Sequence, residues 1–198
     1  MLRMPEDPTN ATVVGIDPGS VMLGVCVIEI DPLTLEIKRV SPTSYNGEKS
    51  NGSEWDELAH GERFSRIYAL SNRLVDLFRR ENPSFIASES PFYNRLRPNA
   101  YGVLMEVLSE IRNACRRYSP YKTLHLIDPP SVKLAVNAKG QKGKEPVKDG
   151  VRSIPELLDN LDVQIDTLDE HAIDATAVAY AFLKKLRSEK GIYATKKE

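Results

Sequence analysis

Short hydrophobic runs bounded by turn signals recur along the chain and predict five strands. The first two are joined by Asp17-Pro18-Gly19-Ser20, and the second ends at Asp31-Pro32, so the first three strands are expected to form a meander. The second run is apolar at nearly every position and is expected to lie centrally in the sheet. The predicted strands are residues 11–16, 21–30, 36–40, 84–88 and 122–127.

Apolar residues spaced three or four positions apart predict helices between and after the later strands. The spacing is regular from Phe64 to Phe78 and from Tyr101 to Tyr118, and a proline follows each segment. The predicted helices are residues 64–81, entered near Trp55, then 98–118, 154–160 and 171–189. A meander followed by alternating helices and strands predicts an α/β fold with a mixed five-stranded sheet flanked by helices.

Length and composition favour a single globular domain. The chain has 198 residues, of which 41% are hydrophobic and 28% charged, and a core of this size needs no disulfide or structural metal. We expect one domain over 11–189, between a flexible stretch at 1–10 and a basic tail at 190–198. Within it, residues 44–62 are expected to form a long loop and 139–150 a basic loop. No stretch approaches the length of a membrane span, which favours a cytoplasmic protein.

The formal net charge of −1 conceals strongly charged segments. Residues 112–152 carry 10 Lys or Arg against 3 Asp or Glu, whereas residues 153–174 carry 7 acidic side chains and no basic one. Basic segments are most often solvated surface. A block of +7 nevertheless raises the expectation of a polyanionic partner such as nucleic acid.

Two carboxylates come at the ends of predicted strands, where side chains are partly shielded from water. Asp17 follows the first strand and Glu89 follows the fourth. Taken alone, Asp17 is the ordinary first residue of a tight turn, and Glu89 is an ordinary surface or helix-capping residue. Both have the chemistry to bind a hard divalent cation such as Mg²⁺ or Mn²⁺.

Asp174 lies in the last predicted helix among small and apolar residues, and His171 precedes it by three positions on the same face. A carboxylate on such a face is desolvated unless it binds a cation or finds a hydrogen-bond partner, for which Thr176 is the nearest candidate. We favour the cation, which these residues would share with the strand-end carboxylates if the fold brings them together.

Four motifs, in matching order along the chain, resemble those of the RuvC-type Holliday junction resolvases of the retroviral-integrase/RNase H superfamily. The resemblance covers residues 12–185, although the 44–60 loop is longer than usual for the family. The motifs are Gly15-Ile-Asp-Pro-Gly-Ser20 followed by Gly24-Val25, Ile86-Ala-Ser-Glu-Ser-Pro-Phe92, Val132-Lys133 through Gly143-Lys144, and His171-Ala-Ile-Asp174-Ala175 followed by Ala177 and Ala179.

The resemblance implies an RNase H-like fold and a catalytic centre that binds two Mg²⁺ or Mn²⁺ ions. Asp17, Glu89, His171 and Asp174 would be both the catalytic and the metal-binding residues. Family members carry either Asp or His at the place of His171, and the neighbouring Glu170 and Asp169 leave this fourth assignment open. Two ions held by such carboxylates suit phosphodiester hydrolysis.

The resemblance also indicates how DNA would be held. Lys133 and Lys144 would lie near the scissile strand, and an aromatic residue after Glu89 would insert between bases at a branch point. The alternative for Phe92 is packing in the hydrophobic core, which the polar residues near it in the sequence disfavour. The DNA-binding candidates are Phe92, Tyr93, Arg95, Arg97, Lys133, Lys139, Lys142, Lys144 and Lys148.

The expected activity is paired, metal-dependent cleavage of four-way DNA junctions in strands of like polarity, leaving 5'-phosphate and 3'-hydroxyl ends. Two cuts from one site per chain imply a homodimer. Its interface is expected on helix 98–118, where Val103, Met105 and Val107 would lie outside the inward-facing seam. The alternatives are a broader flap or fork endonuclease and a non-catalytic branched-DNA-binding protein. A sugar-kinase-like ATPase would need a second lobe that the chain lacks.

Overall fold

The computed structural model describes residues 10–48, 54–93, 95–96, 98–138 and 145–191. Five strands form one sheet in the order β3-β2-β1-β4-β5. They are β1 (Ala11–Asp17), β2 (Met22–Ile30), β3 (Ile37–Asn46), β4 (Phe85–Glu89) and β5 (Leu124–Ile127). The first three pair antiparallel as a meander, while β4 and β5 run parallel to β1. The predicted mixed α/β sheet is confirmed, with β1 at its centre and β2 beside it.

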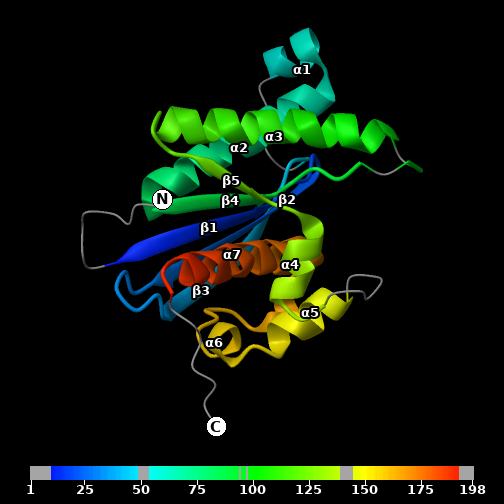
Figure 1. Ribbon diagram of the computed structural model, residues 1–198. Helices are drawn as coiled ribbons and strands as arrows, with labels where there is room; N and C mark the ends of the chain where they lie inside the picture. The colour runs from blue at the N-terminus through cyan, green and yellow to red at the C-terminus, as the bar shows by residue number, and fades with distance from the viewer. Residues whose placement is uncertain (1–9, 49–53, 94, 97, 139–144, 192–198) are drawn as a thin grey trace.

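Helices cover both faces of the sheet (Figure 1). One face is covered by α2 and α3, and the other by α7 with the shorter α4, α5 and α6. The helices are α1 (Glu54–His60), α2 (Glu62–Glu81), α3 (Pro98–Tyr118), α4 (Pro129–Ala135), α5 (Glu145–Arg152), α6 (Pro155–Leu158) and α7 (Glu170–Glu189), with a 3₁₀ turn η1 (Ile165–Thr167). None in the described ranges is long and apolar enough to cross a bilayer.

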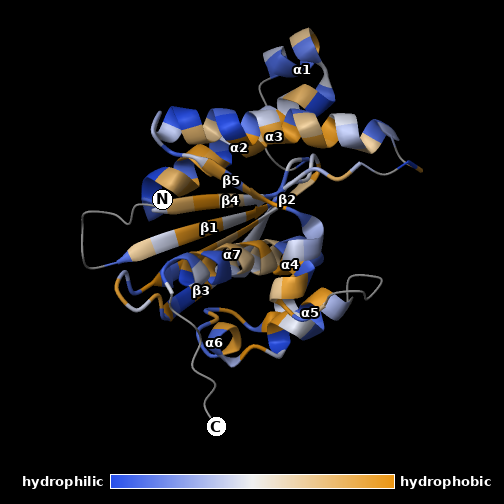
Figure 2. Cartoon of the chain, viewed as in Figure 1, coloured by the Kyte–Doolittle hydropathy of each residue, from blue (hydrophilic) through white to orange (hydrophobic). Residues whose placement is uncertain are grey.

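Alternation along β1 divides its side chains between two cores. Val14 and Ile16 belong to the cluster under α2 and α3, whereas Val13 belongs to the cluster under α7. Because successive side chains of a strand point to opposite faces, Gly15 and Asp17 lie on the α7 face with Val13. Figure 2 shows the resulting hydrophobic strands between the two helical layers.

Two glycines let α7 lie unusually close to the sheet. A Cβ on Gly15 would lie 2.5 Å from the carbonyl oxygen of Ala175, and one on Gly24 would lie 2.0 Å from that of His171. Gly24 is also the direct partner of Asp17 across the β1–β2 ladder. Any larger residue at these positions would push the helix away, so the two glycines fix the height of α7 above β1 and β2.

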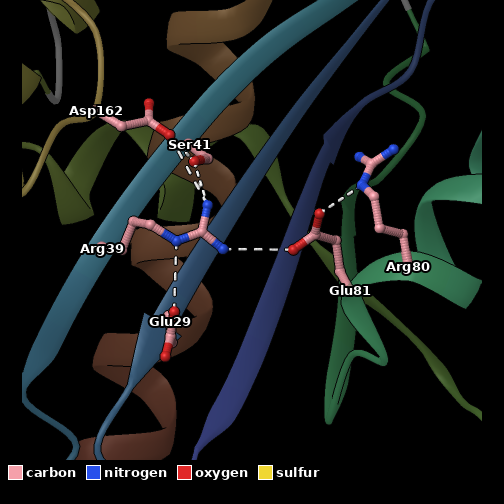
Figure 3. A network of polar contacts seen from close by, with 6 residues as sticks. All are labelled: Glu29, Arg39, Ser41, Arg80, Glu81 and Asp162. Atoms are coloured by element: carbon pink, nitrogen blue, oxygen red, sulfur yellow. Dashed lines mark hydrogen bonds and ion pairs between the residues drawn. The ribbon is translucent and has the colours of Figure 1, made fainter.

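The outer edge of β3 is tied to the acidic segment that follows α6. Val40 bridges Leu161 in parallel, with backbone hydrogen bonds to Asn160 and Asp162. Beside this bridge, Arg39 contacts four side chains from different parts of the chain (Figure 3). Its partners are Glu29 at 3.4 Å, Ser41 at 2.6 Å, Glu81 at 3.4 Å and Asp162 at 3.8 Å. The network joins β2, β3, α2 and the 160–162 segment.

A buried arginine anchors the end of α7. Arg187 donates to both carboxylate oxygens of Glu156 in α6, at 2.9 and 2.8 Å, and to the carbonyl oxygen of Leu35 at 2.8 Å. Tyr180 donates to the same carboxylate at 2.7 Å. The arginine lowers the pKa of Glu156 against the opposing effect of burial. Removing one charge would leave the other desolvated, which is costly.

The structure corrects several predicted boundaries. Residues 44–46 extend β3 instead of opening a loop, and residues 54–60 of the predicted 44–62 loop form α1. Residues 145–150 of the predicted basic loop are helical in α5, whereas 139–144 lie outside the described residues. The fifth strand begins at Leu124, not at residue 122. The two ends of the chain, 1–9 and 192–198, are also outside the described residues.

Candidate active site

Asp17 and Glu89 lie at the same end of two neighbouring parallel strands. The register of β1 with β4 pairs Gly15 with Ala87 and Ile16 with Ser88, so the next residues along are Asp17 and Glu89. Glu89 shares its strand face with Ala87, just as Asp17 shares its face with Gly15. Both carboxylates therefore project toward α7. The sequence placed them at strand ends, and the parallel pairing makes them neighbours.

The first turn of α7 brings two more candidate residues to this point. His171 Nδ1 lies 2.8 Å from Asp17 Oδ2, and His171 Nε2 lies 3.6 Å from Glu170 Oε1. Asp174 follows one turn later and is only partly buried. The hydroxyl of Thr176 donates to the carbonyl oxygen of Ala172 at 2.8 Å, so its proton is not given to Asp174. The side chains of Asp17 and His171 are 14% and 29% exposed, which leaves the site accessible from one side.

Negative charge is concentrated in this corner of the fold. Burial, together with the nearby carboxylates of Asp17 and Asp174, raises the pKa of Glu89 to about 7, while Lys133 opposes the shift. The hydrogen bond that His171 donates to Asp17 raises the pKa of His171 against the effect of burial. The imidazolium of His171 thus compensates one carboxylate, and Lys133 is the main cation facing Glu89.

The donor set suits a hard divalent cation. Its carboxylate oxygens are the ligands that Mg²⁺ and Mn²⁺ prefer, and a bound cation would offset the burial and the repulsion that raise the pKa of Glu89. Within the described ranges, no three His, Cys, Asp or Glu side chains stand at ligand spacing around one point. Asp17 is instead paired with His171. For a cation to bind Asp17, this hydrogen bond would have to break. Either His171 would lose its proton, or one of the two side chains would change rotamer.

The basic segment contributes Lys133 directly. Its helix, α4, follows β5, whose last residue Ile127 pairs with Glu89. Asp128 caps α4 by accepting from the backbone N–H of Ser131 at 3.0 Å. This short turn returns the chain toward the carboxylates, which explains the proximity of Lys133 to Glu89.

The other DNA-binding candidates lie in different surroundings. Phe92 is 64% exposed, so it is not a core residue, and Arg95 is exposed on the same connection. The ring of Tyr93 meets that of Tyr101 edge-on at 5.8 Å. Lys148 lies 3.7 Å from Asp166 and is therefore already paired with the acidic segment. The remaining candidates, Arg97, Lys139, Lys142 and Lys144, fall outside the residues whose side chains the structure describes.

Arg66 supports the site and was missed from the sequence. Its Nε donates to the carbonyl oxygen of Ser20 at 2.8 Å, in the turn that follows Asp17, and Nη1 lies 3.2 Å from Glu62. Gly47 makes room for this side chain, since a Cβ there would lie 2.4 Å from Arg66 Cγ. In the sequence Arg66 is one of several charges on an amphipathic helix, and nothing in that pattern distinguishes it.

No protein-family model matches the sequence, and no curated protein matches it. Solved structures do. RuvC from Thermus thermophilus superposes with a TM-score of 0.64 at 23% identity, covering 91% of this chain and 97% of that one. The same RuvC in complex with a Holliday junction substrate gives 0.62 at 25% identity with the same coverage. The yeast mitochondrial Holliday junction resolvase Ydc2 gives 0.63 at 16% identity, covering 94% and 83%. The resemblance drawn from the four motifs is thus confirmed in three dimensions: this chain has the RNase H-like fold of RuvC and its structural neighbours are Holliday junction resolvases.

Proposed function

We propose that this protein is a structure-selective DNA endonuclease that resolves four-way junctions by metal-dependent phosphodiester hydrolysis. The observation that carries the proposal is the meeting of Asp17 and Glu89, from neighbouring parallel strands, with His171 from the first turn of α7, on a fold shared with resolvases. An accidental cluster of this kind is disfavoured, because burying like charges together is costly unless they bind a cation.

We assign different roles in the reaction to the carboxylates, the histidine and the lysine of the site. Asp17, Glu89 and Asp174 would hold divalent ions, which in such sites activate water and neutralise charge on the phosphate oxygens. His171 has Nδ1 toward Asp17 and Nε2 at 3.6 Å from Glu170 Oε1, and in its neutral form it would orient the attacking water or accept its proton. Lys133 lies close enough to Glu89 to place a positive charge beside the phosphate.

DNA would approach the open side of this site. Arg95 and the exposed rings of Phe92 and Tyr93 follow Glu89 directly, where they can contact the backbone and stack on unpaired bases. Two structural neighbours, the RuvC of Thermus thermophilus and the resolvase of Fowlpox virus, were solved with Holliday junction DNA. This supports branched DNA as the substrate class here.

Paired cleavage of a symmetric junction requires two active sites, and we propose a homodimer with one site on each subunit. The cuts would fall in strands of like polarity and leave 5'-phosphate and 3'-hydroxyl ends. The first half of α3 is the interface candidate, with Met105 exposed and Leu104 half-buried. Val107, expected on the outward side, is buried at 3% exposure and belongs to the core.

The decisive experiment compares cleavage of a mobile four-way junction, a flap and a linear duplex, with Mg²⁺ and with EDTA. We expect paired nicks in the four-way junction, only with Mg²⁺. Asp17→Asn and Asp174→Asn should lose at least about a thousandfold in rate, since the metal supplies most of the catalysis, yet bind the junction in EDTA like the wild type.

The outcomes separate the alternatives. Equal cleavage of flaps and four-way junctions would replace the proposal by a broader branched-DNA endonuclease. Junction binding without cleavage at any Mg²⁺ or Mn²⁺ concentration would identify a non-catalytic binding protein. Near wild-type cleavage by Asp174→Asn would overturn the role assigned to the last helix.

A further inference from the structure

The first turn of α7 is held by a side chain that bonds in two directions. Asp169 is the N-cap of the helix, and its Oδ1 accepts from the backbone N–H of Ala172 at 2.8 Å. Its Oδ2 accepts from the hydroxyl of Ser44 on β3. One carboxylate thus caps the helix and ties it to the sheet.

This tie acts on the part of the helix that enters the site. Ala172 lies between His171 and Asp174, so the capped amide belongs to the same turn as both candidate ligands. On the other side of that turn, the carbonyl oxygen of His171 lies against Gly24. Gly24 limits how closely the turn approaches β2, and the Ser44–Asp169 bond limits its lateral movement relative to β3.

We propose that Ser44 and Asp169 are positioning residues that set His171 and Asp174 against Asp17. The proposal rests on the nuclease function for the roles of His171 and Asp174, and it refines the site by assigning Asp169 to capping. Of the three residues considered for the fourth metal-site position, Asp169 is therefore withdrawn, which leaves His171 and Glu170.

Four substitutions separate positioning from stability. Ser44→Ala removes the tie and keeps the cap. Asp169→Ser also keeps a good N-cap but is too short to reach Ser44, whereas Asp169→Asn preserves both contacts, because its amide can donate to the hydroxyl. Ser41→Ala is the matched control, since Ser41 donates to Asp162 from the same strand without touching α7.

The first measurement uses the metal-free protein and does not depend on cleavage. Titration of the His171 ring by NMR in EDTA should show its pKa closer to the ordinary value in Ser44→Ala, which keeps the charge of Asp169, because His171 drifts from Asp17. Ser41→Ala should titrate like the wild type. Asp169→Ser and Asp169→Asn both lose a charge that raises the pKa of His171, so they are compared with each other, and the pKa should be lower in Asp169→Ser, which also lacks the tie. If Ser44→Ala and Ser41→Ala give the same His171 midpoint, the proposal is wrong.

The second measurement tests the consequence for chemistry. Ser44→Ala and Asp169→Ser should lower the single-turnover rate on a four-way junction about tenfold and raise the Mn²⁺ concentration for half-maximal rate, with unchanged junction affinity in EDTA. The double variant should be no slower than either single one, because both break the same tie. Additive losses would contradict the proposal. If the wild type cleaves nothing, the nuclease function fails, while the NMR titration still decides the positioning role.

Discussion

At the scale of single residues, the site brings three carboxylates close together, and their mutual repulsion opposes the ionised form of Glu89. Glu89 shows this most clearly, because burial and the charges of Asp17 and Asp174 raise its pKa to about 7. An ordinary Glu titrates near 4.5, so the folded protein favours the protonated form of Glu89 over the whole interval between these values. The ionised form needed to bind a cation is therefore obtained at the expense of stability.

This gives a pH-dependent prediction for Glu89→Gln. As pH rises from about 4.5 to about 7, the wild type should lose about 2–3 kcal/mol more stability than the variant. In EDTA, urea unfolding should therefore show the variant more stable by that amount at pH 8 and equal to the wild type at pH 4.5. An equal difference at both pH values would contradict the cause assigned to the shift. Adding Mn²⁺ at pH 8 should stabilise the wild type more than the variant.

His171 changes stability with pH in the same direction. Its raised pKa means that the imidazolium–carboxylate pair with Asp17 stabilises the metal-free fold below pH 6.5 and ceases to do so as pH rises through the folded-state pKa. A proton on His171 also competes with a cation at Asp17. The affinity for Mn²⁺, measured by calorimetry, is therefore expected to rise with pH, and His171→Ala should weaken that dependence, leaving the part that comes from ionisation of Glu89. A variant that keeps the full pH dependence would show that another group controls the affinity.

At the scale of elements, the seating of α7 on two glycines decides the geometry of the site. Gly15 and Gly24 lie on the α7 face of β1 and β2, and each meets the helix backbone at a distance too short for a Cβ. The sequence motif contains both glycines, but their purpose depends on a helix about 150 residues further along the chain. Only the folded structure shows that these two positions must be glycine because the backbone of α7 lies so close to them.

We predict that Gly24→Ala lowers both stability and catalysis. The new methyl group would displace the first turn of α7, since its carbon would lie 2.0 Å from the carbonyl oxygen of His171. Overpacking of this kind costs about 1–3 kcal/mol. Urea unfolding and single-turnover cleavage report the two losses.

Gly102→Ala is the matched control for this variant. Gly102 lies within α3, where a Cβ would meet nothing within 4 Å, so alanine should stabilise the helix by up to about 1 kcal/mol. If Gly24→Ala and Gly102→Ala have the same effect on unfolding and on cleavage, the close approach of α7 at Gly24 does not determine the geometry of the site.

At the scale of the whole molecule, charge is balanced between segments distant from one another in the sequence. Two basic residues of α5 lie beside the acidic stretch that follows α6, where Asp166 accepts from Arg152 and lies 3.7 Å from Lys148. Part of the +7 segment is therefore neutralised internally. Lys133, on α4, faces the active site instead. The separation of charge that suggested a polyanionic partner is thus used in part for contacts within the fold.

The assembly of the molecule can be tested directly. Sedimentation at micromolar concentration should report about twice 22.2 kDa if the first half of α3 forms a dimer interface. Met105→Glu places a charge on that surface without changing the core, and it should give a monomer that binds a junction with reduced affinity. A wild-type monomer that cuts both strands in concert would contradict the dimer.

Much of the fold could be predicted from the sequence, because strands, turns and helices depend on local signals. Turn signals place Asp17 and Glu89 at strand ends, and helical spacing places His171 beside Asp174. That these residues form one site was expected only from the resemblance of the four motifs. The rest depends on long-range contacts. Arg66, Ser44 and Asp169 resemble ordinary surface residues until β3, α2 and the turn after β1 are assembled. Val107 was assigned to the wrong face because the 98–118 seam alone does not show that α2 packs beside it.

The bridge between β3 and the 160–162 segment has a consequence for solution behaviour. An edge strand with free N–H and C=O groups is a template on which another chain can add a strand, leading to aggregates. Here Val40 already has a backbone partner on each side, and Arg39 and Asp162 place opposite charges beside it. The middle of this long edge strand is thereby closed to intermolecular strand addition. Self-association by strand addition at the middle of β3 is therefore disfavoured.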